Sequence, residues 1–187
     1  MPIEFLREYG KHLMITGVRD TRIPNPELVL QQLRQIDEKI AVQILDAKGL
    51  AGMDHLRFAV LNALKAHSQG SQVTGSVAIE ILLYASGQRQ IKNAIAYLGV
   101  SPESKRVAVI GIASEESPLE NLRTQLPKII EGKLDESVLE EGDNATIRRV
   151  FGITDDEMKT MLRRNTTEKE AITRLVIEKM ALLSTQA

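Results

Sequence analysis

The sequence contains no cysteine and no tryptophan, and aromatic residues make up only 3% of its 187 residues. The absence of cysteine excludes disulfide bonds, thiolate nucleophiles and zinc sites built on sulfur. The shortage of aromatic side chains predicts an aliphatic core. Hydrophobic residues (43%) and charged residues (26%) occur at ordinary frequencies, which indicates a globular protein of about one domain.

The sequence also lacks a run of about 20 apolar residues, the length that a membrane-spanning helix needs. Its first residues, Met1-Pro2-Ile3-Glu4-Phe5, contain neither the basic region nor the apolar region of a signal peptide. The absence of cysteine is compatible with a reducing compartment. We therefore expect a cytoplasmic protein that makes no contact with membranes.

The formal net charge is only −1, and it is unevenly distributed. Residues 1–100 carry 11 basic and 9 acidic side chains, whereas residues 101–187 carry 13 and 16. Residues 115–143 alone hold nine acidic and three basic side chains, which predicts a solvated surface that repels RNA. Proteins that grip long duplex nucleic acids are normally basic, so any contact with nucleic acid should be small and local.

Both strands and helices are expected outside residues 48–99. The uninterrupted apolar run at 106–112 indicates a strand buried on both faces. Asn25 and Pro26 are a favourable N-cap and first residue for a helix. Residues 133–139 fit either a strand or a loop. The expected elements are strands at 3–8, 12–18, 40–45 and 106–112, and helices at 26–38 and 117–126.

The longest periodic apolar segments lie within residues 48–99. Asp54 is expected to cap a helix that starts near His55, and Gly70 is a natural end for that helix. Phe58 and Leu61 widen its apolar face, which indicates burial on more than one side. The positions with helical spacing are Leu56, Ala59, Val60, Ala63, Leu64 and His67.

Residues 76–85 are apolar for long enough to form either a buried strand or a buried helix. Ser76 as an N-cap and Gly87 as a left-handed C-cap favour the helix. A second helix is expected over residues 89–98. Its shared apolar face comprises Ile91, Ile95 and Leu98.

The polar corner at residues 86–90 joins these two helices. Its exposed N–H groups at the start of the second helix could bind an anion. Arg89 and Gln90 form a pair that suits a phosphate and a base edge. The simpler interpretation is a connection between helices that binds no ligand.

Helical segments are expected to end the chain. The first spans residues 144–151 and stops at Gly152. Thr154 and Thr167 each open a capping box with the glutamate three residues later, which predicts helices over 158–163 and 171–183. The last helix must bury an apolar face, either within its own domain or against a partner protein. That face comprises Ile172, Leu175, Val176, Lys179, Met180 and Leu183.

No residue pattern for catalysis or for a cofactor is present. Residues 70–76 match a phosphate-binding loop only superficially, because no lysine follows the second glycine. His55 and His67 lie three turns apart on one helix, too far to share a metal ion. The serine, histidine and aspartate residues show no local arrangement of a nucleophilic site. We therefore expect no enzyme activity, no cofactor and no metal site.

Three groups of residues resemble a known family. They are Lys48-Gly49-Leu50-Ala51-Gly52 before an apolar helix, residues 80–91 followed by Ala94-Ile95 and Leu98-Gly99-Val100, and Phe151-Gly152-Ile153-Thr154 with residues 178–183. Together they are similar to archaeal members of the PRPK-binding protein family, in order over nearly the whole chain. This family is the small regulatory subunit of the KEOPS complex, which makes threonylcarbamoyladenosine in tRNA.

The resemblance implies a single mixed α/β domain over residues 1–187, with a small mixed or antiparallel sheet flanked by helices. It implies no catalysis by this chain, because a separate ATP- and metal-dependent subunit performs the transfer. Members of the family bind the small lobe of the kinase-like subunit, largely through the C-terminal helix, here residues 165–187. They also capture the single-stranded CCA end of tRNA. One alternative is a scaffold that binds the kinase-like subunit without contacting RNA, and another is a small-molecule enzyme without a recognisable motif.

The resemblance also implies positions for the two binding sites. The loops at 48–52 and 86–91 are expected to meet and form the RNA site, with Ile91 as an apolar surface under a base. The expected RNA-binding residues are Lys48, Gly49, His55, Ser86, Gly87, Arg89, Gln90 and Ile91. The expected kinase-binding residues are Ile172, Leu175, Val176, Lys179, Met180 and Leu183, a set that also allows weak self-association.

Overall fold

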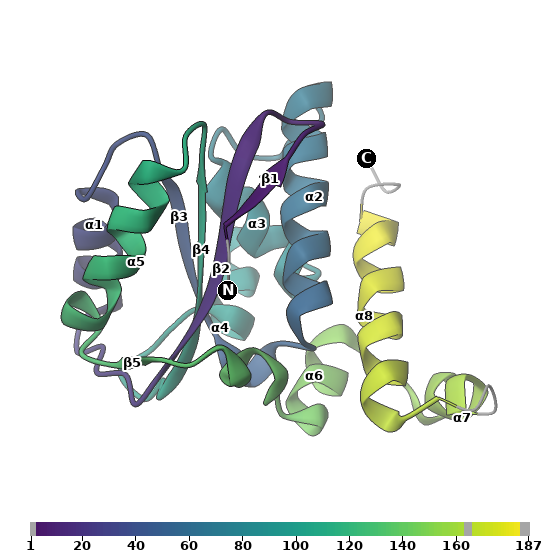
Figure 1. Ribbon diagram of the computed structural model, residues 1–187. Helices are drawn as coiled ribbons and strands as arrows, with labels where there is room; N and C mark the ends of the chain where they lie inside the picture. The colour runs from purple at the N-terminus through teal and green to yellow at the C-terminus, as the bar shows by residue number, and fades with distance from the viewer. Residues whose placement is uncertain (1–2, 163–165, 184–187) are drawn as a thin grey trace. The chain divides into compact units, whose positions relative to one another are not determined.

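The computed structural model describes residues 3–162 and 166–183 (Figure 1). The chain divides into two compact units, each made of two segments. One unit comprises residues 1–47 and 99–139 and contains the β-sheet, and the other comprises residues 48–98 and 140–187 and is helical. The α/β fold with an antiparallel sheet confirms the fold class expected from the sequence. The single domain expected over residues 1–187 stays a prediction.

Five antiparallel strands form the sheet within the part of the chain that the structure describes. β1 (Glu4–Leu6) and β2 (Lys11–Arg19) form the expected N-terminal hairpin. β2 also pairs with β4 (Arg106–Ala113), which in turn pairs with β3 (Ala41–Asp46). The short β5 (Lys133–Leu134) pairs with the end of β2. The order β1-β2-β4-β3 therefore places β4 inside the sheet.

The core of the sheet unit is aliphatic, as the composition predicted. β4 is buried on both faces, because every residue from Val107 to Ala113 is buried. Two helices, α1 (Pro26–Arg34) and α5 (Ser117–Ile129), cover one face of the sheet (Figure 1). The side chains that pack there include Met14, Val18, Val29, Leu33, Val42, Ile44, Val107, Val109, Leu119, Leu122 and Leu126.

A local signal sets the start of α1, whereas other element ends in this unit differ from the expectation. The side chain of Asn25 accepts a hydrogen bond from the N–H of Leu28 at 3.1 Å, as expected for the N-cap of α1. α1 ends at Arg34, before the expected end near residue 38, and α5 continues through Pro127. The ambiguous stretch at 133–139 forms β5 and a 3-10 helix at Glu136–Glu140.

The helical unit is organised by α2 and α8, which lie side by side (Figure 1). α8 also packs against the two helices that precede it in sequence. Within residues 3–162 and 166–183, no helix has both the length and the apolar character needed to cross a membrane. The helices of this unit are α2 (Met53–Gln69), α3 (Val77–Ser86), α4 (Ile91–Leu98), α6 (Asn144–Phe151), α7 (Asp155–Leu162) and α8 (Glu168–Leu183).

Residues 76–85 are helical rather than extended, as their flanking residues indicated. The Oγ of Ser76 accepts a hydrogen bond from the N–H of Ile79 at 3.4 Å, which caps the start of α3. Gly87 closes the same helix with a φ of +65°. The two end signals therefore decide a segment that periodicity left open.

Both predicted capping boxes are present. The carboxylate of Glu157 accepts a hydrogen bond from the N–H of Thr154 at 2.7 Å, at the start of α7. The carboxylate of Glu170 accepts one from the N–H of Thr167 at 3.0 Å, at the start of α8. α7 extends to Leu162, and its expected end at residue 163 lies outside the described residues.

The start of α2 differs from the expectation. The helix begins at Met53, with Gly52 before it at a φ of +100°, so Asp54 lies inside the first turn and is not the N-cap. Glu140 takes that role, because its Oε1 accepts the N–H of Met53 at 2.9 Å. A cap from so distant a residue leaves no local signal in the sequence. Phe58 is exposed, so the buried face of α2 is narrower than predicted.

Candidate functional site

Residues 86–90 form the corner between α3 and α4 that the sequence predicted. Gly87 turns it with a φ of +65°, and a Cβ at this position would lie 3.0 Å from the ring of Phe151. Only glycine adopts this conformation readily. Ser86 is buried, and its Oγ donates a hydrogen bond to the carbonyl oxygen of Leu83 at 3.1 Å. The expected contact between Ser86 and RNA is therefore wrong, because its hydroxyl is enclosed in α3.

His55 is fully buried in the first turns of α2. Its Nδ1 accepts a hydrogen bond from the N–H of Ala51 at 3.0 Å, and its Nε2 donates one to the carbonyl oxygen of Ala85 at 2.8 Å. Burial lowers the pKa of His55 to about 4, although the bond to Ala85 raises it. The ring also meets Phe151 edge-on. His55 is a structural core histidine, so its expected contact with RNA is wrong.

The loops at 48–52 and 86–91 were expected to meet. The ring of His55 connects the first loop to the end of α3 beneath the surface, through its hydrogen bonds to Ala51 and Ala85. The exposed side chains of the two loops flank opposite ends of α4. Gly49 is buried against Leu98 at the C-terminal end of α4, whereas Arg89 precedes its N-terminal end. A helix of this length extends about 12 Å. Lys48 and Arg89 are both exposed, as a contact with RNA requires, and their binding role stays a prediction.

α4 buries a different stripe from the one predicted. Ala94 and Leu98 are buried, whereas Ile91 and Ile95 are exposed. The prediction that Ile91, Ile95 and Leu98 share a buried face is therefore wrong for the two isoleucines. The helix packs against its unit along the side that carries Ala94 and Leu98. The exposure of Ile91 and Gln90 leaves both side chains accessible to a ligand at the corner.

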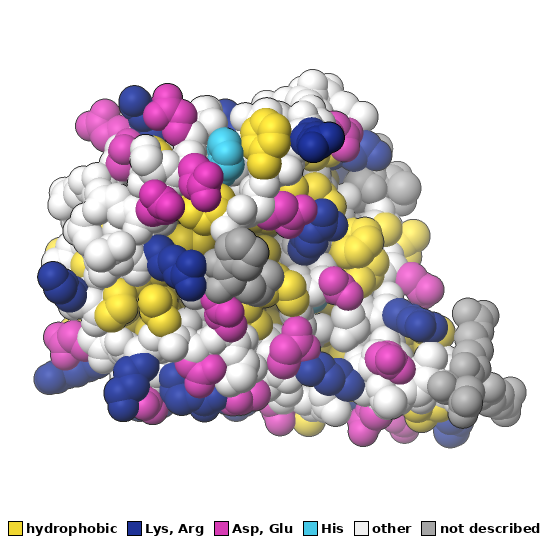
Figure 2. Space-filling model, viewed as in Figure 1, with side chains coloured by type: hydrophobic (Ala, Val, Ile, Leu, Met, Phe, Trp, Pro, Cys, Tyr) yellow, Lys and Arg dark blue, Asp and Glu magenta, His cyan; other side chains and the backbone are white. Residues whose placement is uncertain are grey.

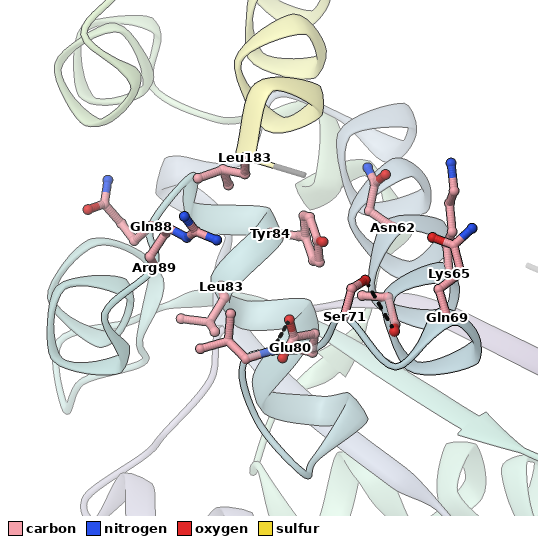
Figure 3. Close-up of a pocket in the computed structure, with 12 residues that line it drawn as sticks. Asn62, Lys65, Gln69, Ser71, Glu80, Leu83, Tyr84, Gln88, Arg89 and Leu183 are labelled. Carbon is pink, nitrogen blue, oxygen red and sulfur yellow. Dashed lines mark hydrogen bonds between the residues drawn. The ribbon is translucent and has the colours of Figure 1, made fainter. Parts of the chain in front are cut away.

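A pocket of about 300 Å³ lies beside this corner (Figure 3). In Figure 3, Gln88 and Arg89 lie on one side of Tyr84, and Asn62 and Lys65 of α2 lie on the other. The last turn of α8 contributes Leu183 to the wall. The full lining comprises Asn62, Lys65, Ala66, Gln69, Ser71, Val73, Glu80, Leu83, Tyr84, Gln88, Arg89 and Leu183.

Charges of both signs line this pocket. The buried carboxylate of Glu80 accepts hydrogen bonds from the N–H groups of Val73 and Thr74 at 3.2 and 3.0 Å, which holds that loop against α3. Burial and the charge of Glu80 raise the pKa of Tyr84, and the nearby Arg89 opposes this shift. The phenol therefore stays protonated at neutral pH and can donate a hydrogen bond.

The sequence pointed to only part of this pocket. Arg89 was expected as a ligand contact, and Tyr84 stands out as the aromatic residue beside the loop. The polar residues of α2 were missed because they lie far from the corner in sequence. The sequence feature that could have identified them is the helical spacing of Asn62, Lys65 and Gln69, which places all three toward one side of α2.

The apolar face of α8 packs within the chain. Ile172, Leu175, Val176 and Met180 are buried, in a helix that contacts α2, α3, α6 and α7. This outcome matches the alternative in which the helix buries its face in its own domain. These four side chains are therefore not exposed for a partner, contrary to the expectation for the kinase-binding surface.

The two remaining residues of that predicted surface are half-buried. The Nζ of Lys179 donates a hydrogen bond to Oε1 of Glu157 at 2.9 Å, which joins α8 to α7. Leu183 lines the pocket beside the corner. The exposed side chains of α8 are instead those on its other face, including Arg174, Glu178 and Leu182.

Comparison with known proteins places the chain among proteins that bind kinases. Residues 21–184 match the model of the family described as kinase binding protein CGI-121. The chain is also 32% identical over 143 residues to the regulatory protein Cgi121 of Methanocaldococcus jannaschii, over 75% of this chain and 85% of that protein. The chain therefore belongs to the CGI-121 family of kinase-binding regulatory proteins, which confirms the resemblance found in the sequence.

Proposed function

We propose that this protein is a non-catalytic, cytoplasmic subunit of the KEOPS complex that binds its kinase-like subunit and captures the single-stranded CCA end of tRNA. The observation that carries the RNA role is the corner itself. It presents Arg89, Gln90 and Ile91 to solvent directly beside a pocket that contains Tyr84. These residues offer a cation, an amide, an apolar surface and an aromatic ring within one small area.

Each of these groups suits a single-stranded RNA end. A guanidinium binds phosphate with fixed geometry, an amide pairs with base edges, and an aromatic ring stacks on an unpaired base. Figure 2 shows acidic and basic side chains interspersed on the face in view, without a broad basic patch. With a net charge of −1, a compact site for a few nucleotides is more compatible with this surface than a duplex-binding face.

We expect the kinase-like subunit to bind the exposed face of α8, because the face predicted from the sequence is mostly buried within the chain. Leu182 is 56% exposed near the C-terminal end of this helix, and Arg174 and Glu178 lie exposed along the helix. An exposed leucine flanked by charged side chains is a common element of a helix that docks into a partner's groove. Leu182→Glu should therefore weaken binding to the kinase-like subunit, whereas Leu28→Glu, at a similarly exposed leucine of α1, should not.

The RNA role is tested by binding of matched tRNAs with and without the CCA end. We expect removal of CCA to abolish most of the affinity, with a shallow dependence on salt. Arg89→Glu should also abolish tRNA binding while the kinase-like subunit remains bound. Lys39→Glu is the matched control, because it makes the same charge change at an exposed site in the sheet unit. Equal binding of both tRNAs would exclude capture of the CCA end, and absence of binding to either would leave the scaffold function without RNA contact.

A further inference from the structure

Two adjoining hollows lie around the first turns of α8, away from the corner between α3 and α4. The outer hollow is lined by residues 51–54 at the start of α2 and by side chains between 167 and 177. A smaller cavity of about 110 Å³ adjoins it, and Glu140 and Lys169 line both. We infer that these hollows bind a free α-amino acid with a small branched aliphatic side chain, which fills the cavity while the two charged groups pair with Glu140 and Lys169.

One side of the inner cavity is apolar. Leu50, Ile147 and Ile172 line it, and all three side chains are buried. An apolar cavity of about 150 Å³ is large enough to hold a benzene molecule. The smaller volume of about 110 Å³ therefore suits about four carbon atoms. This is the size of the side chain of leucine.

Backbone contacts between two loops hold one wall of the cavity in place. The N–H of Asp143 donates a hydrogen bond to the carbonyl oxygen of Lys48 at 2.8 Å. Gly142 passes so close to the same loop that a Cβ there would overlap the carbonyl oxygen of Leu50. A ligand would therefore enter a cavity that already exists, without rearrangement of the backbone.

The ion pair between Glu140 and Lys169 lies where the two hollows meet, because both side chains line both of them. Oε2 of Glu140 is 2.5 Å from Nζ of Lys169, and the side chains are 46% and 53% exposed. An ion pair as exposed as this one contributes little to stability. A ligand that supplies a new partner for each charge can therefore replace it at little cost.

The two charges select a ligand that carries charges of both signs. A carboxylate alone would pair with Lys169 but would lie beside the carboxylate of Glu140, which repels it. An amine alone would leave Lys169 without its partner. An α-amino acid carries an ammonium group for Oε2 of Glu140 and a carboxylate for Nζ of Lys169. Oε1 of Glu140 can keep its hydrogen bond from the N–H of Met53, so the start of α2 is retained.

Calorimetric titration of the full chain with leucine and its analogues tests this inference on the unmodified protein. Isocaproate lacks the ammonium group, isoamylamine lacks the carboxylate, and glycine lacks the side chain. We expect leucine to bind with a dissociation constant of about 1 mM or below, the scale for so small a ligand. Each analogue should bind at least about tenfold more weakly, because it loses a charge-assisted hydrogen bond or the burial of the side chain.

Variants of the ion pair locate the binding site. Lys169→Met and Glu140→Gln should each weaken leucine binding at least about tenfold, because each removes one charged partner. Glu140→Gln retains an acceptor for the N–H of Met53. Lys159→Met is the matched control, since it breaks an exposed ion pair with Asp156 on α7. This control should bind leucine as the unmodified protein does.

Three results would overturn the inference. They are absence of leucine binding, equal binding of glycine or isocaproate, and leucine binding that is unchanged in Lys169→Met. Because the series of ligands uses the unmodified protein, it decides the matter even where a variant fails to fold. The outcome is independent of the proposed RNA and kinase roles, which involve other residues.

Discussion

The imidazole of His55 donates a hydrogen bond of 2.8 Å from Nε2 to the carbonyl oxygen of Ala85, at the last turn of α3. Its Nδ1 accepts the N–H of Ala51 at 3.0 Å. Both ring nitrogens thus form hydrogen bonds when the imidazole is neutral and carries its proton on Nε2. A proton added to Nδ1 would face the N–H of Ala51, so protonation disrupts the link between the loop at 48–52 and α3.

This link predicts that stability depends on pH. Burial lowers the pKa of His55 from 6.5 to about 4. The pKa of His55 is lower in the folded state than in the unfolded state. The stabilisation that neutral His55 gives the folded state is therefore complete above pH 6.5 and is lost as the pH falls toward 4. The loss should reach about 3 kcal/mol, since one pKa unit corresponds to about 1.4 kcal/mol. Urea unfolding at pH 7.5 and at pH 4.5 measures it.

A pair of histidine variants identifies the source of that pH dependence. His55→Gln should lower the free energy of unfolding at pH 7.5 and flatten its change with pH between 6.5 and 4. His12→Gln, at a half-buried histidine of β2, should keep the pH dependence of the unmodified protein. An unchanged slope in His55→Gln would assign the effect to carboxylates instead.

Two glycines with the same backbone conformation allow a matched test of the corner. Gly87 and Gly152 end α3 and α6 with φ values of +65° and +60°. A Cβ at Gly152 meets no atom within 4 Å, whereas at Gly87 it would press on Phe151 at 3.0 Å. Gly152→Ala should cost about 1 kcal/mol for the left-handed conformation, and Gly87→Ala should cost more. Equal losses in urea unfolding would show that the ring of Phe151 moves aside without cost.

The sequence predicted well those features that depend on neighbouring residues. The capping boxes at Thr154 and Thr167, the cap at Ser76 and the glycine ends of helices all involve residues within a few positions of each other. Such contacts form whatever the rest of the fold does. They were sufficient to show that residues 76–85 are helical.

The failures share a different cause. Glu140 caps α2 from far along the chain, and the burial of His55 depends on a carbonyl of α3. Neither partner can be identified from local spacing. The same reason explains why Ile91 and Ile95 of α4 were assigned to a buried face, and why the apolar face of α8 was found but its covering, by the chain itself or by a partner, was left open.

The burial of α8 predicts an effect on the isolated protein. Met180 is fully buried, so Met180→Ala should reduce the free energy of unfolding by about 2–5 kcal/mol. Leu182 is 56% exposed, and Leu182→Ala should change it by less than about 0.5 kcal/mol. Thermal unfolding without any partner measures both. If Met180→Ala leaves the free energy of unfolding unchanged but abolishes kinase binding, this face of α8 contacts the partner and does not stabilise the isolated protein.

The last prediction concerns Glu140, whose carboxylate serves two partners. Its Oε1 accepts the N–H of Met53 at 2.9 Å, and its Oε2 lies 2.5 Å from Nζ of Lys169. Burial raises the pKa of Glu140, but the hydrogen bonds from Lys169 and Met53 outweigh this and lower it. The side chain therefore acts both as the N-cap of α2 and as an ion-pair partner for α8.

Substitutions at Glu140 and Lys169 separate these two roles. Glu140→Ala removes the cap and the ion pair and should cost about 1–2 kcal/mol of unfolding free energy. Glu140→Gln keeps an acceptor for Met53, so it should cost less, and Lys169→Met should cost under about 1 kcal/mol because the pair is partly exposed. A double-mutant cycle between Glu140→Gln and Lys169→Met measures the ion pair alone. If Glu140→Gln costs as much as Glu140→Ala, the charge on Glu140 matters more than its hydrogen bond to Met53, and the start of α2 depends on α8.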